Sequence, residues 1–170
     1  SERDGVATAI EQQADESGAI TTRSGEASAR IESARLFNDR NTEVDLLEVE
    51  QRARLCITAR VVQDIPELVV GFVIRDRLGQ SVFGTNSAYN GQSLQGLKAG
   101  STVSADFDYP ANLGEGEYVV SIALHAGFDH TQRCYDWWDG AISFEVVNPS
   151  LPKFSGSAWL PTNITVTVND

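Results

Sequence analysis

The chain has 170 residues, of which 41% are hydrophobic and 22% charged, a composition that supports one globular domain with its own core. Its formal net charge of −11 excludes a phosphate-rich partner such as DNA, RNA or an anionic membrane surface, because like charges repel. It contains no run of about 18 apolar residues, so the sequence predicts no insertion into a membrane. Because Met is absent, we expect a fragment of a longer protein.

The chain begins with a polar, acidic stretch and then turns into β structure. Residues 1–25 predict a linker or N-terminal extension, with a weak helix signal over 6–16. Residues 26–150 predict an all-β domain, an antiparallel β-sandwich, because short alternating strands are separated by turn residues. The candidate strands are 28–37, 53–62, 68–76, 81–85, 101–109, 116–125, 141–147 and 162–168.

The strand alternation predicts a core face and an unusual outer face. In 68–76, 101–109, 116–125 and 141–147, every second residue is large and apolar, and these residues form the predicted core. The opposite faces are rich in small residues such as Gly71, whereas a solvated sheet face usually carries long charged side chains. The sequence therefore predicts a shallow trough in which a flat ligand can lie.

The last segment, 151–170, is predicted to extend beyond the sandwich. It follows a Pro-containing break and ends in the alternating strand 162–168. Such a strand can pair within its own subunit or reach a partner, and an unpaired edge is an aggregation liability. We therefore expect a homodimer in which this strand is exchanged or paired between subunits.

The two cysteines predict free thiols. Cys56 alternates with core residues and shares its face with Arg54 and Arg60, so it cannot form the core disulfide of an immunoglobulin domain. The only other cysteine is Cys134. Free thiols indicate a reducing compartment.

A polar cluster follows strand 116–125. His125, Asp129, His130 and Cys134 lie within ten residues, but their spacing does not match a closed zinc site, so we expect no metal. We expect this loop to border a ligand site instead, with a plain polar loop as the alternative. No phosphate-binding glycine loop or nucleophile elbow is present, and no cofactor is expected.

Two loops carry aromatic side chains. Among Tyr135, Trp137 and Trp138, one residue is expected to close the end of the sandwich. Adjacent tryptophans on an extended segment cannot both face inward, so we expect an exposed one, Trp138, which can stack on a sugar ring. The neighbouring Asp136 and Asp139 can accept hydroxyl hydrogen bonds. A second polar and aromatic loop holds Asn86, Ser87, Tyr89, Asn90 and Gln92.

A series of short motifs follows one another in a characteristic order and spacing. They are Gly71-Phe72-Val73-Ile74-Arg75-Asp76, Gly79, Val82-Phe83-Gly84-Thr85-Asn86, Leu94, Leu97, Gly100, Leu113, Gly116-Glu117-Tyr118, Tyr135-Asp136-Trp137, Ala141 and Phe144-Glu145-Val146. Taken together, these motifs resemble one family, the C-terminal carbohydrate-binding domain of Wzt-type proteins. Wzt-type proteins are the nucleotide-binding subunits of ABC transporters that export O-antigen polysaccharide. The resemblance covers about residues 26–147.

The resemblance implies an immunoglobulin-like sandwich that dimerises, with a jelly-roll-like sandwich as the alternative. It implies that the domain recognises the non-reducing terminus of a lipid-linked O-antigen polysaccharide and licenses its export. The implied partners are the polysaccharide, a second copy, the attached ATPase domain and the transmembrane subunit. The implied location is cytoplasmic, at the inner face of the inner membrane.

We therefore expect a non-catalytic glycan-binding module rather than an enzyme. For a carboxylate or phosphate on the glycan, Arg75 and Arg133 are the candidates, because a guanidinium pairs bidentately with such groups. The alternatives are a glycan hydrolase or lyase, which needs only two suitably spaced carboxylates, and a purely structural dimerisation module. The expected glycan-binding residues are Arg75, Asn86, Tyr89, His125, Asp129, His130 and Trp138.

Overall fold

The structure, a computed structural model, describes residues 9–14, 20–128 and 133–170 and is all-β, as predicted. In the described part of the chain, no helix is long and apolar enough to cross a membrane. The strands are β1 (Ala9–Ala14), β2 (Ile20–Gly25), β3 (Ala29–Phe37), β4 (Leu46–Glu48), β5 (Arg52–Val61), β6 (Ile65–Asp76), β7 (Ser81–Asn86), β8 (Leu94–Leu97), β9 (Thr102–Pro110), β10 (Gly116–Ala126) and β11 (Arg133–Val147).

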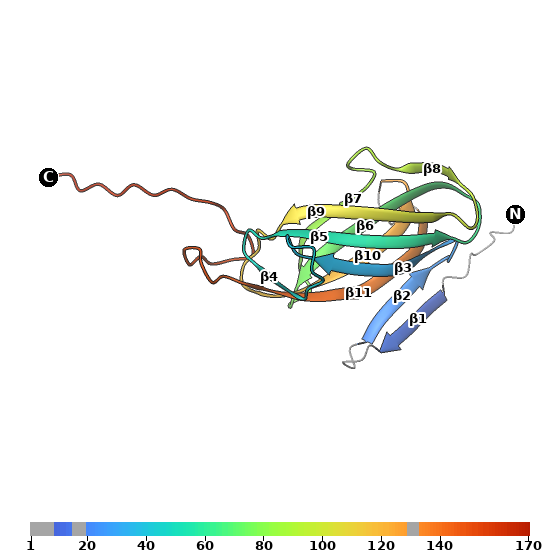
Figure 1. Ribbon diagram of the computed structural model, residues 1–170, viewed down its shortest axis with the longest axis horizontal. Helices are drawn as coiled ribbons and strands as arrows, with labels where there is room; N and C mark the ends of the chain where they lie inside the picture. The colour runs from blue at the N-terminus through green and yellow to red at the C-terminus, as the bar shows by residue number, and fades with distance from the viewer. Residues whose placement is uncertain (1–8, 15–19, 129–132) are drawn as a thin grey trace, which may run out of the picture.

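Two sheets pack face to face as a sandwich (Figure 1). The larger one, here sheet A, has the order β1-β2-β11-β10-β6-β7, and β4 and β8 pair at its margins with β11 and β6. The smaller one, sheet B, has the order β3-β5-β9. Among the described strands, all pairings are antiparallel except that of the short β4 with β11. The antiparallel sandwich predicted from the alternation is therefore confirmed.

The core lies between the sheets and uses the predicted residues. Strand β6 contributes Leu68, Val70, Phe72 and Ile74, all buried, and strand β10 contributes the apolar residues of the same parity. The ring of Phe72 meets that of Phe107 on sheet B edge-on, with 5.0 Å between centroids. Inward residues of β9 are only partly buried, because β9 is the outer strand of sheet B and pairs with β5 alone among the described strands.

The N-terminal stretch differs from the prediction. Residues Ile20–Gly25, expected within a linker, form β2, which pairs antiparallel with β11 at Trp137–Asp139. Residues Ala9–Ala14, where a helix is weakly signalled, form β1 and pair with β2. The remainder of that helix signal lies outside the described residues. Pairing with a strand distant in sequence overrides weak local propensity, which is why sequence pattern alone misassigns this segment.

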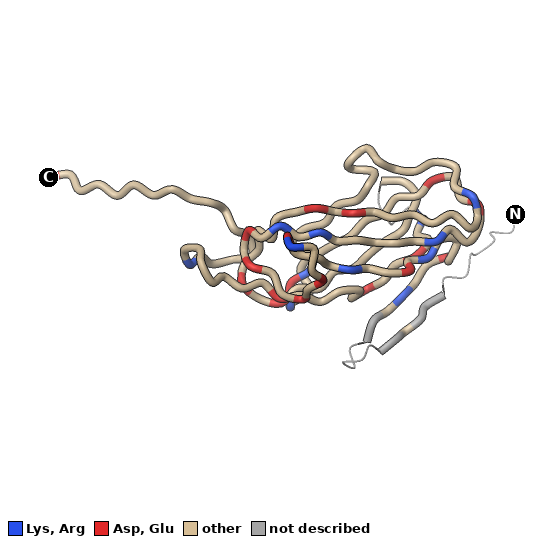
Figure 2. Tube along the Cα trace, in the orientation of Figure 1, with Lys and Arg blue, Asp and Glu red and all other residues tan. Residues whose placement is uncertain are grey.

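The C-terminal segment also differs. The strand expected at 162–168 is absent, because those residues find no partner strand among the described residues of their own subunit. Residues 151–159 instead pack on the end of the sandwich: Leu113 bridges Ala158, and Trp159 Nε1 donates to Glu50 at 2.5 Å. Beyond them the chain runs away from the body (Figure 1), and it is uncharged between Lys153 and Asp170 (Figure 2).

Both cysteines are free, and Cys56 lies on the outward face of β5 as predicted. Burial raises the pKa of the Cys134 thiol to about 11. The nearby carboxylates of Asp136 and Glu26 add to this shift. Both charges disfavour a thiolate, so Cys134 stays protonated at neutral pH.

Candidate functional site

The outer face of sheet A is hollowed where small residues were predicted. We call this hollow, of about 330 Å³, the outer trough. Its floor includes Gly71, Val73, Gly84 and Ala123, which stand where a solvated sheet face would carry long charged side chains. It is lined by Gly71, Phe72, Val73, Arg75, Ser81, Gly84, Thr85, Asn86, Tyr89, Ala123, His125 and Trp137.

Four of the seven residues expected from sequence line this one hollow. They are Arg75 from β6, Asn86 from the end of β7, Tyr89 from the following loop and His125 from β10. Tyr89 is exposed at the rim, whereas His125 is almost fully buried, with its Nδ1 lying 3.4 Å from the carbonyl oxygen of Ala126. The antiparallel pairing of β7, β6 and β10 brings together residues that are up to 50 positions apart.

Asn86 shapes the trough through hydrogen bonds within the protein. Its Oδ1 accepts the Tyr89 N–H at 2.8 Å, and its Nδ2 donates to the Phe128 carbonyl at 2.9 Å. The side-chain amide therefore ties the Tyr89 loop to the segment that follows β10. Asn86 therefore positions Tyr89, and both ends of its side-chain amide are engaged within the protein.

The two tryptophans point to opposite faces of sheet A. Trp137 pairs with Ala123 and lines the outer trough, whereas Trp138 pairs with the core residue Ile122 and packs against the core. The expectation that Trp138 is the exposed, outward tryptophan is therefore wrong. The guanidinium of Arg23 covers the Trp138 ring at 4.9 Å. Tyr135, fully buried with its hydroxyl donating to the Glu67 carbonyl at 2.8 Å, is the residue that closes the end of the sandwich.

The same alternation could have identified Trp137. Ala141, Ser143 and Glu145 occupy odd positions on the outward face, and the pattern continues backwards to Asp139 and Trp137 if the strand does. The sequence prediction began this strand at Ala141. In the structure β11 begins at Arg133, and a bulge around Gly140, which has a φ of 68°, keeps the parity unchanged.

A polar network lies at one end of the outer trough. Arg75 Nη1 donates to Ser121 Oγ at 3.3 Å and lies 3.6 Å from Asp139 Oδ1. Ser121 Oγ donates to the same carboxylate oxygen at 2.5 Å. The guanidinium of Arg75 also lies over the Trp137 ring, 5.8 Å from its centroid. This end of the trough therefore offers a guanidinium, a carboxylate and an aromatic face close together.

Asp136, three residues before Asp139, has a different role. Its carboxylate is buried between the sheets, where it accepts the Ile31 N–H at 2.8 Å and pairs with Arg23. Arg23 also donates to the Ile31 carbonyl at 2.8 Å. This cluster joins β2, β3 and β11, so Asp136 is placed to hold the fold together and not to meet a ligand.

Two expected residues, Asp129 and His130, lie outside the described residues. Arg133, expected as an anion partner, donates from Nε to Glu26 at 2.8 Å. In the described ranges no group of three or more His, Cys, Asp or Glu side chains is placed to hold a metal ion.

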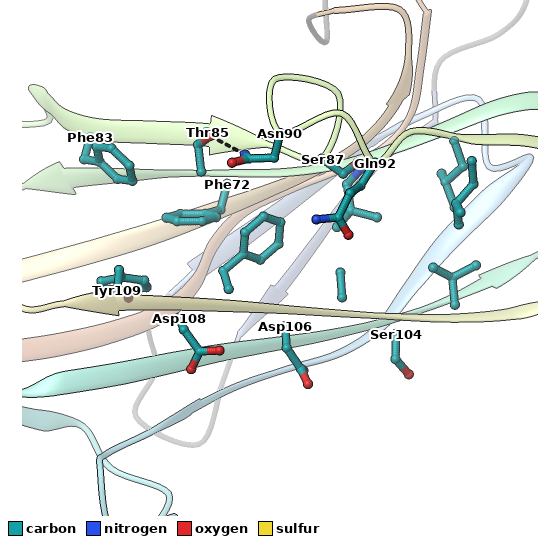
Figure 3. Close-up of a pocket in the computed structure, with 16 residues that line it drawn as sticks. Phe72, Phe83, Thr85, Ser87, Asn90, Gln92, Ser104, Asp106, Asp108 and Tyr109 are labelled. Atoms are coloured by element: carbon teal, nitrogen blue, oxygen red, sulfur yellow. Dashed lines mark hydrogen bonds between the residues drawn. The ribbon is translucent and has the colours of Figure 1, made fainter.

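A second hollow opens between the sheets at the edge formed by β7 and β9. This inter-sheet cleft has a volume of about 460 Å³ (Figure 3). Phe72, Phe83 and Tyr109 lie in it, whereas Asp106 and Asp108 of β9 point away from it (Figure 3). Burial raises the pKa of Tyr109 to about 12. The cleft combines apolar side chains, such as those of Phe72 and Tyr109, with polar side chains from the loop after β7.

The sequence matches the family model described as the Wzt C-terminal domain over residues 20–160. Among solved structures, the chain is similar to the crystal structure of the C-terminal domain of wzt. The TM-score is 0.74 at 22% identity, and the match covers 85% of this chain and 87% of that chain. This likeness confirms the sandwich fold. No curated protein sequence gives a match.

Other solved structures are more distant. Alkylpurine DNA glycosylase AlkC from Pseudomonas fluorescens gives a TM-score of 0.45 at 14% identity, covering 71% of this chain and 30% of that chain. A beta-glucosidase from Listeria innocua gives 0.41 at 13% identity, covering 69% and 15%. Similarity at this level carries no argument about function.

Proposed function

Because this chain belongs to the Wzt C-terminal domain family, we propose that its outer trough binds the polysaccharide that a Wzt-type ABC transporter exports. The family match confirms the resemblance first seen in the sequence motifs. The observation that carries the proposal is that two aromatic side chains, those of Tyr89 and Trp137, line the same hollow as a floor of small residues. A sugar ring presents a flat C–H face to an aromatic ring and hydroxyls around its rim.

The polar groups of the trough suit the hydroxyls of such a ring. Asp139 and Thr85 can accept hydroxyl hydrogen bonds, and the Arg75 guanidinium can donate them. Asp139 lies at the margin of the trough beside Arg75, and among the described residues that line the trough itself none carries a carboxylate. A glycosidase needs two carboxylates across the scissile bond, so the lining favours a binding module over a glycan-cleaving enzyme.

The ligand in this proposal is the non-reducing terminus of a lipid-linked O-antigen polysaccharide. The shape of the trough supports end recognition, because Tyr89 at the rim and the network at Arg75 bound it on two sides. The domain would act in the cytoplasm at the inner face of the inner membrane, beside the ATPase domain and transmembrane subunit of the transporter. Binding there would license export.

Calorimetric titration with intact polysaccharide and with the same polymer lacking its terminal residue tests this function. We expect binding of the intact polymer only, and equal affinity for both would refute end recognition. Trp137→Ala should weaken binding about 30-fold, the effect of removing a central aromatic contact worth about 2 kcal/mol. The control is Phe37→Ala, which removes an aromatic ring flanked by Arg35 and Arg54 on the outer face of sheet B.

We further propose that the domain is a homodimer in which the C-terminal segment of one subunit enters the inter-sheet cleft of the other. Ile164, Val166 and Val168 are 78%, 87% and 84% exposed, although they alternate as in a half-buried strand. The segment 151–159 anchors the chain firmly before this stretch begins. An exposed apolar segment therefore runs away from the body of the domain, beyond the anchored residues 151–159 (Figure 1).

The inter-sheet cleft lies beside an unpaired strand edge with which the C-terminal segment can pair. Strand β9 pairs only with β5 among the described strands, so one edge of sheet B has open backbone groups. Pairing along this edge would direct alternate side chains into the cleft, toward Phe107 and Tyr109. The partner's valines and isoleucine would then complete the core.

Light scattering coupled to size-exclusion chromatography tests this arrangement. Val166→Asp should convert a dimer to a monomer, because a carboxylate placed against the rings of Phe107 and Tyr109 would lose hydration. Thr165→Asp places the same charge on the opposite side of the strand and should leave the dimer intact. A Val166→Asp variant that remains dimeric would exclude this segment from the interface.

A further inference from the structure

Both arginines suggested by sequence for an anionic group already have carboxylate partners. Arg75 lies 3.6 Å from Asp139, and Arg133 donates to Glu26 at 2.8 Å. An arginine kept for a ligand phosphate or carboxylate would be expected to present its donors unpaired, since a bidentate pair uses two of them. Here the charge of each arginine is balanced within the protein.

Ser121 holds the Asp139 carboxylate in place beside Arg75. The serine is almost fully buried, and its hydroxyl donates to Asp139 Oδ1 at 2.5 Å while accepting from Arg75 Nη1 and from the Gly140 N–H at 3.2 Å. The Asp139 side chain is 56% exposed and that of Arg75 is 32% exposed. Without Ser121 such a half-exposed pair would rearrange easily. The buried hydroxyl fixes both partners at once.

Arg75 and the adjacent Asp139 together leave the outer trough without a formal net charge. Arg75 is the one arginine or lysine among the described lining residues, and that lining contains no aspartate or glutamate. The adjacent Asp139 balances the charge of Arg75. The protein around it is strongly acidic, with a formal net charge of −11, so its general field also opposes an anion.

We propose that Asp139 is a specificity-determining residue that keeps the outer trough electrically neutral and thereby restricts its ligand to an uncharged sugar. This inference rests on the proposed glycan-binding function of the trough. A terminal carboxylate or phosphate would lie near the Asp139 carboxylate and meet repulsion in a partly desolvated site. A hydroxyl would instead donate to Asp139 and accept from Arg75.

Titration of the full chain with inorganic phosphate at constant ionic strength tests the role of Asp139 without any glycan. The readout is the indole N–H resonance of Trp137 in ¹H–¹⁵N NMR spectra, since this ring lies beside the Arg75 guanidinium. Asp139→Asn keeps an oxygen to accept the Ser121 hydroxyl but removes the charge. We expect Asp139→Asn to bind phosphate at the trough at least about tenfold more tightly than the wild-type chain.

The matched control is Glu117→Gln, which makes the same charge change on an exposed residue of β10 outside the trough lining. It should leave the Trp137 resonance insensitive to phosphate. Equal responses of the wild-type chain and of Asp139→Asn, including no response from either protein, would overturn the proposal. So would a Glu117→Gln effect equal to that of Asp139→Asn, because net charge alone would then explain the change.

A second experiment compares glycans. Neutral polysaccharides and polysaccharides ending in a uronic acid or a phosphorylated sugar are titrated into both proteins. The wild-type chain should bind neutral ends, and Asp139→Asn should gain affinity for acidic ones. Preference of the wild-type chain for acidic ends would refute the proposal. Failure of the wild-type chain to bind any glycan would refute the glycan-binding function, and the phosphate titration would still decide the role of Asp139.

Discussion

Replacing Asp136 by Asn should destabilise the domain strongly. The Asp136 side chain is 3% exposed and that of its partner Arg23 is 15% exposed. Asparagine keeps an oxygen for the Ile31 N–H but leaves the guanidinium without a counter-charge between the sheets. Removing one partner of a buried ion pair costs about 3–5 kcal/mol. We expect the lower end of that range, about 3 kcal/mol, because the Ile31 bond survives and Arg23 retains some solvent contact.

Urea unfolding followed by tryptophan fluorescence measures this effect. With a slope of about 1–3 kcal/mol/M, a loss of about 3 kcal/mol lowers the midpoint by about 1–3 M. The internal control is Asp139→Asn, the same substitution three residues later in β11. Its ion pair with Arg75 is half exposed, so the loss should stay below about 1 kcal/mol. Equal losses for the two variants would show that burial of Asp136 is not what makes its ion pair important.

Three further predictions concern other parts of the fold. Gly71→Ala should destabilise the domain by about 1–3 kcal/mol in urea unfolding, because the new Cβ would lie 2.9 Å from the Asn86 Cβ; an unchanged midpoint would contradict this. Since burial raises the pKa of Tyr109 to about 12 from about 10 in unfolded chains, the native state favours the neutral phenol. The stability that this provides is complete below about pH 10 and is lost as pH rises toward 12. Tyr109→Phe should flatten that decline in the free energy of unfolding, which chemical unfolding across this pH range measures. At pH 8, iodoacetamide should modify Cys134 more slowly than it modifies cysteine in solution, because the pKa of about 11 leaves little thiolate. Mass spectrometry measures the extent of modification, and rapid labelling would refute the assigned burial.

The candidate site could be predicted in part from sequence, and the reason differs from residue to residue. Arg75 and His125 occupy outward positions of strands whose alternation is regular, so their meeting on one face follows from pairing of β6 with β10. Tyr89 lies in the second polar and aromatic loop and is among the glycan-binding residues expected from the sequence. Trp137 required knowing that β11 starts at Arg133, and aromatic residues in a long irregular strand carry no boundary signal of their own.

Alternation of apolar and polar residues by itself determined the sandwich and its core, because a strand's period of two residues is a local property of the chain. It also determined that Cys56 faces outward. Only the tertiary structure decided that Asp136 is buried while Asp139 meets Arg75, and that the segment after Leu160 has no partner strand among the described residues of its own subunit. These outcomes depend on contacts between residues distant in sequence, whose free energies no local pattern contains.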